Sequence, residues 1–307
     1  MSDGEAMQSR PVMISGVWVP LVTPFKDGQV DLQSYRRLIE HYLTRGVTGV
    51  VPLGTTGEAP TLDDAEADAV VAATVETVAG RVPVFVGIGG NATRKVLKNI
   101  DRLGRFEFPG IVSVCPYYNR PTQDGLLQHF TALSEATDRK ILIYNIPYRT
   151  SVNLSNDSLL RLAERRNIVG VKDSSGSIAQ SLELLARRPA EFSVLTGEDP
   201  LFFTMICNGA DGGVLAAAHL ATEEFVAVAR LVTSNDHVAA RTIWSSLRDL
   251  TSRLFREPNP MPVKYCLWRQ GLIRSPECRL PLSSISDGLA RELDCWIEKA
   301  DRVPLRQ

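Results

Sequence analysis

Eight short runs of mostly apolar residues recur along the chain, roughly 20 to 35 residues apart. Continuous apolar runs of this kind are typical of parallel strands covered on both faces. The runs are 16-GVWVPLV-22, 47-VTGVVPLG-54, 82-VPVFVGIG-89, 110-GIVSVCPYY-118, 140-KILIYNIP-147, 168-IVGVK-172, 192-FSVLTG-197 and 212-GGVLAAA-218. Amphipathic segments lie between them, so the alternation predicts an α/β fold in the form of a (β/α)8 TIM-type barrel. An open sheet that binds a dinucleotide is disfavoured, because 87-GIGGNATRK-95 lacks the GxGxxG spacing.

The segments between the runs carry helix start and stop signals. The segment 31–46 begins with an Asp cap and ends at Gly46, and 61–80 begins at Thr61 with acidic residues in its first turn. After residue 232 the alternation gives way to three further helical patterns, set off by 257-EPNP-260. We therefore predict a barrel over residues 14–232 and a C-terminal helical region over 233–307.

Charge and cysteine content narrow the classes of partner. The 34 basic and 35 acidic residues give a net charge of −1, which disfavours nucleic acid and anionic membranes as partners. Five widely spaced cysteines form no metal-type pair and suit free thiols in a reducing compartment. The first 13 residues are polar, and no apolar run approaches the roughly 20 residues needed to cross a bilayer. We expect a cytoplasmic protein whose partners are small molecules or further subunits.

Polar residues gather where the predicted strands end. In a barrel of this type the chemistry lies on the loops after the carboxyl ends of the strands, so these residues should share one site. The stretches are 54-GTTGE-58, 116-PYYNRP-121, 144-YNIPYRT-150, 172-KDSSG-176 and 197-GED-199.

Lys172 follows an apolar strand, where an ammonium group would lose hydration. Burial favours the neutral amine and lowers its pKa, which produces a nucleophile able to form a Schiff base with a carbonyl. The imine withdraws electrons, so the neighbouring carbon can lose a proton and add to an aldehyde without a metal or organic cofactor. Tyr144, Tyr118 and Thr55 are the hydroxyl groups available at neighbouring strand ends to relay protons. His219 lies just past the eighth strand, where a capping or packing role is the competing interpretation.

Two features suit carboxylate groups of a substrate. Arg149 would place a planar cationic fork at the mouth of the barrel. The glycine-flanked turn 54-GTTG-57 would offer backbone N–H groups and hydroxyls to a second carboxylate. A keto acid substrate fits both features.

These motifs resemble the pyruvate-dependent class I aldolase superfamily, which includes dihydrodipicolinate synthase and N-acetylneuraminate lyase. The resemblance runs from about residue 16 to about residue 286 and includes GTTGE, PYYNRP, YNIPYRT, VGVK and EPNPMPVK in the same order. It implies that Lys172 forms the imine with pyruvate and that Tyr144 and Thr55 relay protons. Tyr118 would complete the relay in a neighbouring subunit, which implies a dimer or a tetramer built from dimers.

The resemblance also implies substrate-binding residues. Thr56 would help to hold the carboxylate of pyruvate, Leu215 would face the keto acid with its backbone, and Gly197 would line the site. Arg149 would receive the carboxylate of L-aspartate 4-semialdehyde. Tyr118 and Arg149 together favour the synthase reaction of lysine biosynthesis, which condenses pyruvate with that aldehyde.

Several departures from the synthase pattern keep alternatives open. KDSSG and 213-GVLAA-217 differ from common synthase motifs, and Tyr148 replaces a small residue and would narrow the entrance. These departures favour a lyase, aldolase or dehydratase that acts on a 2-keto-3-deoxy sugar acid or a 4-hydroxy-2-oxo acid. A non-catalytic keto-acid sensor is the third possibility, and Lys172 and Tyr144 speak against it. Lys95 stands where lysine-inhibited synthases carry an acid, so we expect no inhibition by lysine.

Overall fold

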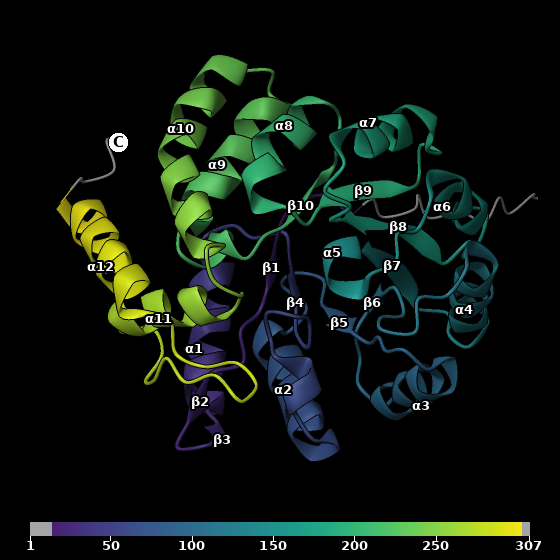
Figure 1. Cartoon of the computed structure of the whole chain (residues 1–307), viewed down its shortest axis with the longest axis horizontal. Helices are drawn as coiled ribbons and strands as arrows, with labels where there is room; N and C mark the ends of the chain where they lie inside the picture. The colour runs from purple at the N-terminus through teal and green to yellow at the C-terminus, as the bar shows by residue number, and fades with distance from the viewer. Residues whose placement is uncertain (1–13, 303–307) are drawn as a thin grey trace, which may run out of the picture.

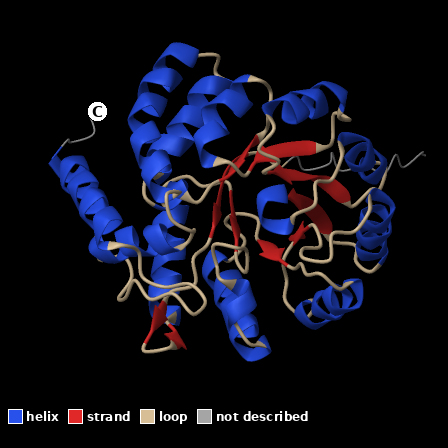
Figure 2. Cartoon of the chain, viewed as in Figure 1, coloured by secondary structure: helices blue, strands red, loops and turns tan. Residues whose placement is uncertain are grey.

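A computed structural model describes residues 14–302 and contains a closed barrel of eight parallel strands (Figures 1 and 2). The strands pair in the order β4-β1-β10-β9-β8-β7-β6-β5, and a parallel bridge between Val50 and Val84 joins the two ends of the sheet. Each predicted run contains one strand, which confirms the predicted fold class. The barrel strands are β1 (Gly16–Pro20), β4 (Gly49–Val51), β5 (Phe85–Gly87), β6 (Gly110–Val114), β7 (Lys140–Asn145), β8 (Ile168–Asp173), β9 (Ser193–Thr196) and β10 (Gly212–Val214).

A helix follows every barrel strand, and each helix before β10 returns the chain to the start of the next strand. Figure 2 shows these helices around the strands. The helices of the barrel domain, which surround the sheet, are α1 (Leu32–Leu43), α2 (Asp64–Val78), α3 (Thr93–Leu103), α4 (Gln123–Glu135), α5 (Pro147–Thr150), α6 (Asn156–Ala163), α7 (Ile178–Arg187), α8 (Phe202–Cys207) and α9 (Thr222–Thr233). Short elements complete the list: the β2–β3 hairpin (Phe25–Lys26 and Gln29–Val30) and the 3-10 turns η1 (Ala59–Thr61), η2 (Asp199–Leu201) and η3 (Ala217–His219).

The start of one helix differs from the sequence prediction. The segment expected to begin at Thr61 is a 3-10 turn there, and α2 begins at Asp64. Asp63 caps α2 by accepting the N–H of Glu66, whose side chain accepts the N–H of Asp63 in return. This reciprocal capping box satisfies two otherwise free N–H groups, which a Thr61 cap would leave unpaired.

The buried side chains form two layers on either side of the barrel wall. Trp18, Phe85, Leu142 and Leu195 belong to a small cluster inside the barrel, and the Trp18 and Phe85 rings meet edge to face with their centroids 5.1 Å apart. A larger cluster lies between the strands and the surrounding helices. The inner cluster also contains Tyr144, so the polar end of this side chain is held at the edge of an apolar core.

Three helices follow the barrel: α10 (His237–Leu254), α11 (Met261–Arg269) and α12 (Asp287–Arg302). In Figure 1, α10 lies beside α8 and α9, while α12 lies at the periphery next to α11. The polar segment 1–13 and the last five residues of the predicted C-terminal region lie outside the described residues. Within residues 14–302, no helix is long and apolar enough to cross a membrane.

Candidate active site

Lys172 lies inside the barrel wall near the carboxyl end of β8. In the register of the sheet, Lys172 lies opposite Tyr144 on β7 and Leu195 on β9, so these three side chains project from the same face of the sheet. Lys172 is 8% exposed, and its Nζ lies 4.0 Å from the centre of the Tyr144 ring. The amine therefore stands against an aromatic face with little access to water.

The surroundings of Lys172 lower its pKa to about 8, and burial is the largest cause. Asp199 and Glu198 oppose this effect, while the Arg149 guanidinium reinforces it. Burial also raises the pKa of the Tyr144 phenol, which keeps that hydroxyl protonated at neutral pH. The pair thus combines an amine that loses its proton easily with a phenol that holds its proton.

Gly197 provides the space that the Lys172 side chain occupies. A Cβ at Gly197 would lie 2.6 Å from Cε of Lys172 and 2.2 Å from Oγ of Ser174. Both distances are too short for a van der Waals contact, so any residue larger than glycine would clash here. Gly197 follows β9, and Glu198 and Asp199 come directly after it. Asp199 is buried, its Oδ1 accepts the N–H of Ala217 at 2.5 Å, and burial raises its pKa to about 7.

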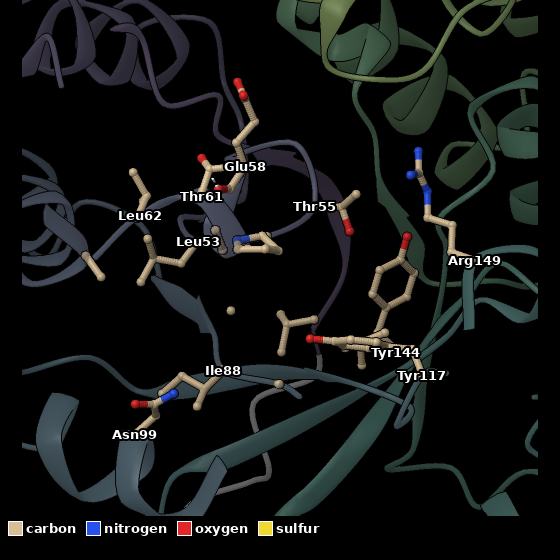
Figure 3. A pocket seen from close by; sticks show the side chains of 18 of the residues that line it. Leu53, Thr55, Glu58, Thr61, Leu62, Ile88, Asn99, Tyr117, Tyr144 and Arg149 are labelled. Carbon is tan, nitrogen blue, oxygen red and sulfur yellow. Dashed lines mark hydrogen bonds between the residues drawn. The ribbon is translucent and has the colours of Figure 1, made fainter. Parts of the chain in front are cut away.

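A cavity of about 570 Å³ opens at the carboxyl ends of the strands. Three of the predicted residues line it, and Figure 3 shows these three, Thr55, Tyr144 and Arg149, together on one side of the cavity. Leu53 and Leu62 lie on the opposite side. Lys172 does not line the cavity, but Tyr144 contacts both the cavity and the amine.

Thr56 is buried behind the cavity wall and is held by a residue from beyond the barrel. The amide of Asn259 donates from Nδ2 to Oγ1 of Thr56 at 2.8 Å, and Asn259 itself lines the cavity. Because Oγ1 of Thr56 accepts this hydrogen bond, its own hydrogen is free to be donated elsewhere. Leu215 is fully buried in the outer hydrophobic layer, its backbone N–H donates to the carbonyl oxygen of Trp18 at 2.9 Å, and it does not line the cavity.

Tyr118 lies apart from the other predicted residues. It is 89% exposed, its φ is +73°, and it does not line the cavity of its own chain. The preceding residue, Tyr117, lines the cavity instead. Tyr148 is 63% exposed and does not line the cavity, but its ring lies beside Arg149, which does. The expectation that Tyr148 narrows the entrance therefore stays a prediction.

Ser174, Glu198 and Asp199 lie in stretches that the sequence placed at the site, KDSSG and GED, but neither they nor Asn259 of EPNPMPVK had been given an individual role. His219 has a structural role. Its Nε2 accepts the N–H of Val22 at 3.2 Å, and its Nδ1 lies 2.9 Å from the carbonyl oxygen of Ala216. Among residues 14–302, no group of three or more His, Cys, Asp or Glu side chains is arranged to hold a metal ion.

Comparison with known proteins identifies close relatives of this architecture. The model of the dihydrodipicolinate synthetase family matches residues 13–300. A curated relative, 4-hydroxy-tetrahydrodipicolinate synthase 2 of Clostridium acetobutylicum, is 50% identical over 284 residues, which cover 92% of this chain and 99% of that protein.

Solved structures also resemble the chain. A dihydrodipicolinate synthase variant described as the first monomeric one superposes with a TM-score of 0.92 at 37% identity, over 95% of this chain and 98% of that chain. The chloride-inhibited dihydrodipicolinate synthase from Acinetobacter baumannii, solved in complex with pyruvate, gives a TM-score of 0.91 at 35% identity, over 95% of this chain and 100% of that chain.

Proposed function

This chain belongs to the dihydrodipicolinate synthetase family, and we propose that it is a 4-hydroxy-tetrahydrodipicolinate synthase that condenses pyruvate with L-aspartate 4-semialdehyde. It is a lyase of the class I, Schiff-base type, and its reaction belongs to lysine biosynthesis. The observation that carries the proposal is the buried amine of Lys172, with a pKa lowered to about 8, against the ring of Tyr144 inside the barrel.

The first half-reaction uses the neutral amine of Lys172. Its Nζ attacks C2 of pyruvate, and loss of water from the adduct leaves an imine. The protonated Tyr144 phenol supplies the proton that the departing hydroxide needs. The imine draws electrons from C3, which loses a proton to give an enamine, so the reaction as proposed uses no metal or organic cofactor.

The second half-reaction joins two carbon skeletons. The enamine carbon attacks the aldehyde carbon of the second substrate, and Thr55 and Tyr144 carry a proton to the new alkoxide. The amino group of the second substrate then attacks C2 and displaces Lys172, which closes the ring and frees the enzyme. Thr56, held as a hydrogen donor by Asn259, suits the carboxylate of pyruvate. Arg149 at the cavity rim suits the carboxylate of the aldehyde.

A panel of aldehydes tests the identity of the second substrate. With pyruvate as the donor, we expect kcat/KM for L-aspartate 4-semialdehyde to exceed that for aldehydes without a carboxylate by at least about a hundredfold, because an unpaired Arg149 loses its charge-assisted bonds. The measurement is the steady-state rate for each aldehyde at saturating pyruvate. Preference for a sugar-acid substrate would instead assign the chain to the lyase and dehydratase branch of the superfamily.

Arg149→Ala should separate the two half-reactions. We expect KM for L-aspartate 4-semialdehyde to rise about tenfold to a hundredfold, the effect of losing a charge-assisted hydrogen bond, while imine formation with pyruvate stays within about twofold. Arg149→Lys is the matched control, because it keeps the charge but not the planar fork. Equal damage to pyruvate trapping and to aldehyde use would show that Arg149 does not bind the second substrate.

Tyr118 supports the proposal of an active dimer. A bulky residue with positive φ stores strain, and such strain is common at functional sites. A phenol that is 89% exposed has no role in the cavity of its own chain, but it is free to reach into the site of a second subunit. We therefore expect the active species to be a dimer or a dimer of dimers.

Mixed subunits test this assignment. Tyr118→Phe and Lys172→Met should each be impaired alone, whereas a coexpressed equal mixture should recover roughly a quarter of wild-type activity. Half of the dimers are then mixed, and one of their two sites is intact. Activity is measured on the purified mixture, and sedimentation gives its mass. No recovery, or a fully active monomer, would exclude a contribution from the partner.

The position of Lys95 supports the expectation that free lysine does not inhibit the enzyme. It is exposed in the first turn of α3, where its ammonium group would repel the ammonium groups of a lysine ligand. We expect about 1 mM lysine, the upper end of common Michaelis constants, to leave the rate unchanged. Lys95→Glu is the matched variant, and clear inhibition of the wild-type enzyme would contradict the expectation.

A further inference from the structure

Ser174 has a fully buried hydroxyl with no hydrogen-bond partner among the described residues. It lies two positions after Lys172, and strand alternation directs both side chains to the inside of the barrel. Both side chains lie next to Gly197: a Cβ added there would be 2.2 Å from Oγ of Ser174 and 2.6 Å from Cε of Lys172. The two side chains are therefore neighbours. An unpaired buried hydroxyl costs free energy, and such groups call for a functional explanation.

Glu198 is a second polar group without a partner in the same place. Its Oε1 is buried and makes no hydrogen bond among the described residues, and its backbone N–H is fixed by Oγ1 of Thr196 at 3.1 Å. The carboxyl group directly follows Gly197, so it stands beside the Ser174 hydroxyl at the ends of β8 and β9. The remainder of Glu198 is partly exposed, which connects this carboxyl group to solvent.

The electrostatic environment links both groups to Tyr144. The Ser174 hydroxyl lies close enough to the Tyr144 phenol and to the Glu198 carboxyl group to lower the pKa of both. Burial, the larger cause, raises the pKa of Glu198, which increases the fraction that carries a proton. A carboxyl group, a hydroxyl and a phenol thus follow one another from the edge of the site to the amine of Lys172.

We propose that Ser174 passes protons between the Glu198 carboxyl group and the Tyr144 phenol, and so provides a proton route within one subunit. When Tyr144 has given its proton to a reaction intermediate, the phenolate takes the proton of Ser174, and Ser174 takes one from Glu198. Glu198 regains its proton from water. This route runs in parallel with the one through Tyr118 of a partner subunit, and it rests on the proposed function.

Ser174→Ala tests the route without a risk to folding, because it removes a buried hydroxyl that makes no hydrogen bond. We expect an unchanged or higher melting temperature, an unchanged half-saturating pyruvate concentration in borohydride trapping, and a kcat lowered about three- to tenfold. Ser113→Ala is the matched control. Ser113 is also a fully buried serine with an unpaired hydroxyl. Its neighbours Val112 and Val114 line the cavity, so strand alternation turns Ser113 to the opposite face of β6, and kcat of Ser113→Ala should be unchanged.

Double variants distinguish parallel routes from independent effects. Ser174→Ala combined with Tyr118→Phe should lower kcat by more than the product of the two single effects. Glu198→Gln should match Ser174→Ala and add nothing to it. A kcat for Ser174→Ala within twofold of wild type, or a double variant no worse than that product, would overturn the proposal. Absence of pyruvate trapping in the wild-type enzyme would instead overturn the proposed function.

Discussion

Replacing Lys172 with Met should abolish borohydride trapping of pyruvate and lower kcat/KM by at least about 10⁴-fold. Met has a similar length and no nucleophilic nitrogen, so the barrel interior stays filled while the imine has no atom on which to form. Mass spectrometry of the reduced protein should show one pyruvyl group on the Lys172 peptide of the wild-type enzyme and none on the variant.

Lys172→Arg is the control for charge. It keeps a cation beside Asp199 and Glu198 but provides no neutral amine at any working pH, so it should be as inactive as Lys172→Met. A pyruvyl group on another lysine, or activity retained by either variant, would show that the chemistry begins elsewhere.

The pH dependence of trapping follows from the lowered pKa of Lys172. An ordinary lysine with a pKa of 10.5 is neutral in roughly one molecule of 3,000 at pH 7, whereas a pKa of about 8 leaves roughly a tenth of the amines neutral. Only the neutral amine attacks, so the rate of imine formation should rise about tenfold per pH unit below pH 8 and level off above it. A rate that keeps rising to pH 10 would contradict this assignment.

Replacing Lys264 with Met should be the most destabilising of the changes considered, by about 3–5 kcal/mol. Lys264 and Glu58 form an ion pair with 0% and 1% of their side chains exposed, which joins α11 to the loop that carries Thr55 and Thr56. Burial lowers the pKa of Lys264, and the carboxylate of Glu58 opposes that effect. Loss of the lysine removes the ion-pair partner of the buried Glu58 side chain, which keeps the N–H of Arg279 as a hydrogen-bond donor at 2.9 Å.

Chemical denaturation measures this loss as a change in the free energy of unfolding. The double change Glu58→Gln with Lys264→Met should recover part of the stability, because it removes both charges. Arg187→Met is the control: it breaks exposed ion pairs with Asp157 and Glu183 and should change stability little. Equal effects of Lys264→Met and Arg187→Met would show that burial of the pair is unimportant.

Local sequence patterns were sufficient to predict the barrel because each strand is covered on both faces. That requirement leaves eight apolar runs, and all eight contain a strand. Helix starts were less certain, since several residues near one start are able to cap it. At α2, Thr61 and Asp63 are both plausible caps, and the reciprocal hydrogen bonds with Glu66 decide in favour of Asp63.

The candidate site was predictable only in part. Lys172 and Tyr144 lie near the carboxyl ends of β8 and β7, and Thr55 and Arg149 lie shortly after β4 and β7. The fold alone therefore brings all four to one end of the barrel. Asn259 reaches Thr56 from 203 residues away, a pairing that no local pattern indicates. The effect of Tyr148 on the entrance stays a prediction, since the short helix α5 leaves its ring exposed beside Arg149.

By itself, the sequence determined the order of strands, the class of fold and the lysine on which the chemistry is proposed to begin, because each depends on residues that are neighbours in the chain. Tertiary structure alone decided how buried that amine is, which acids and hydroxyls surround it, and how the C-terminal helices hold the loop around Thr56. These properties depend on desolvation and on contacts between residues far apart in sequence, and both exist only once the barrel has closed.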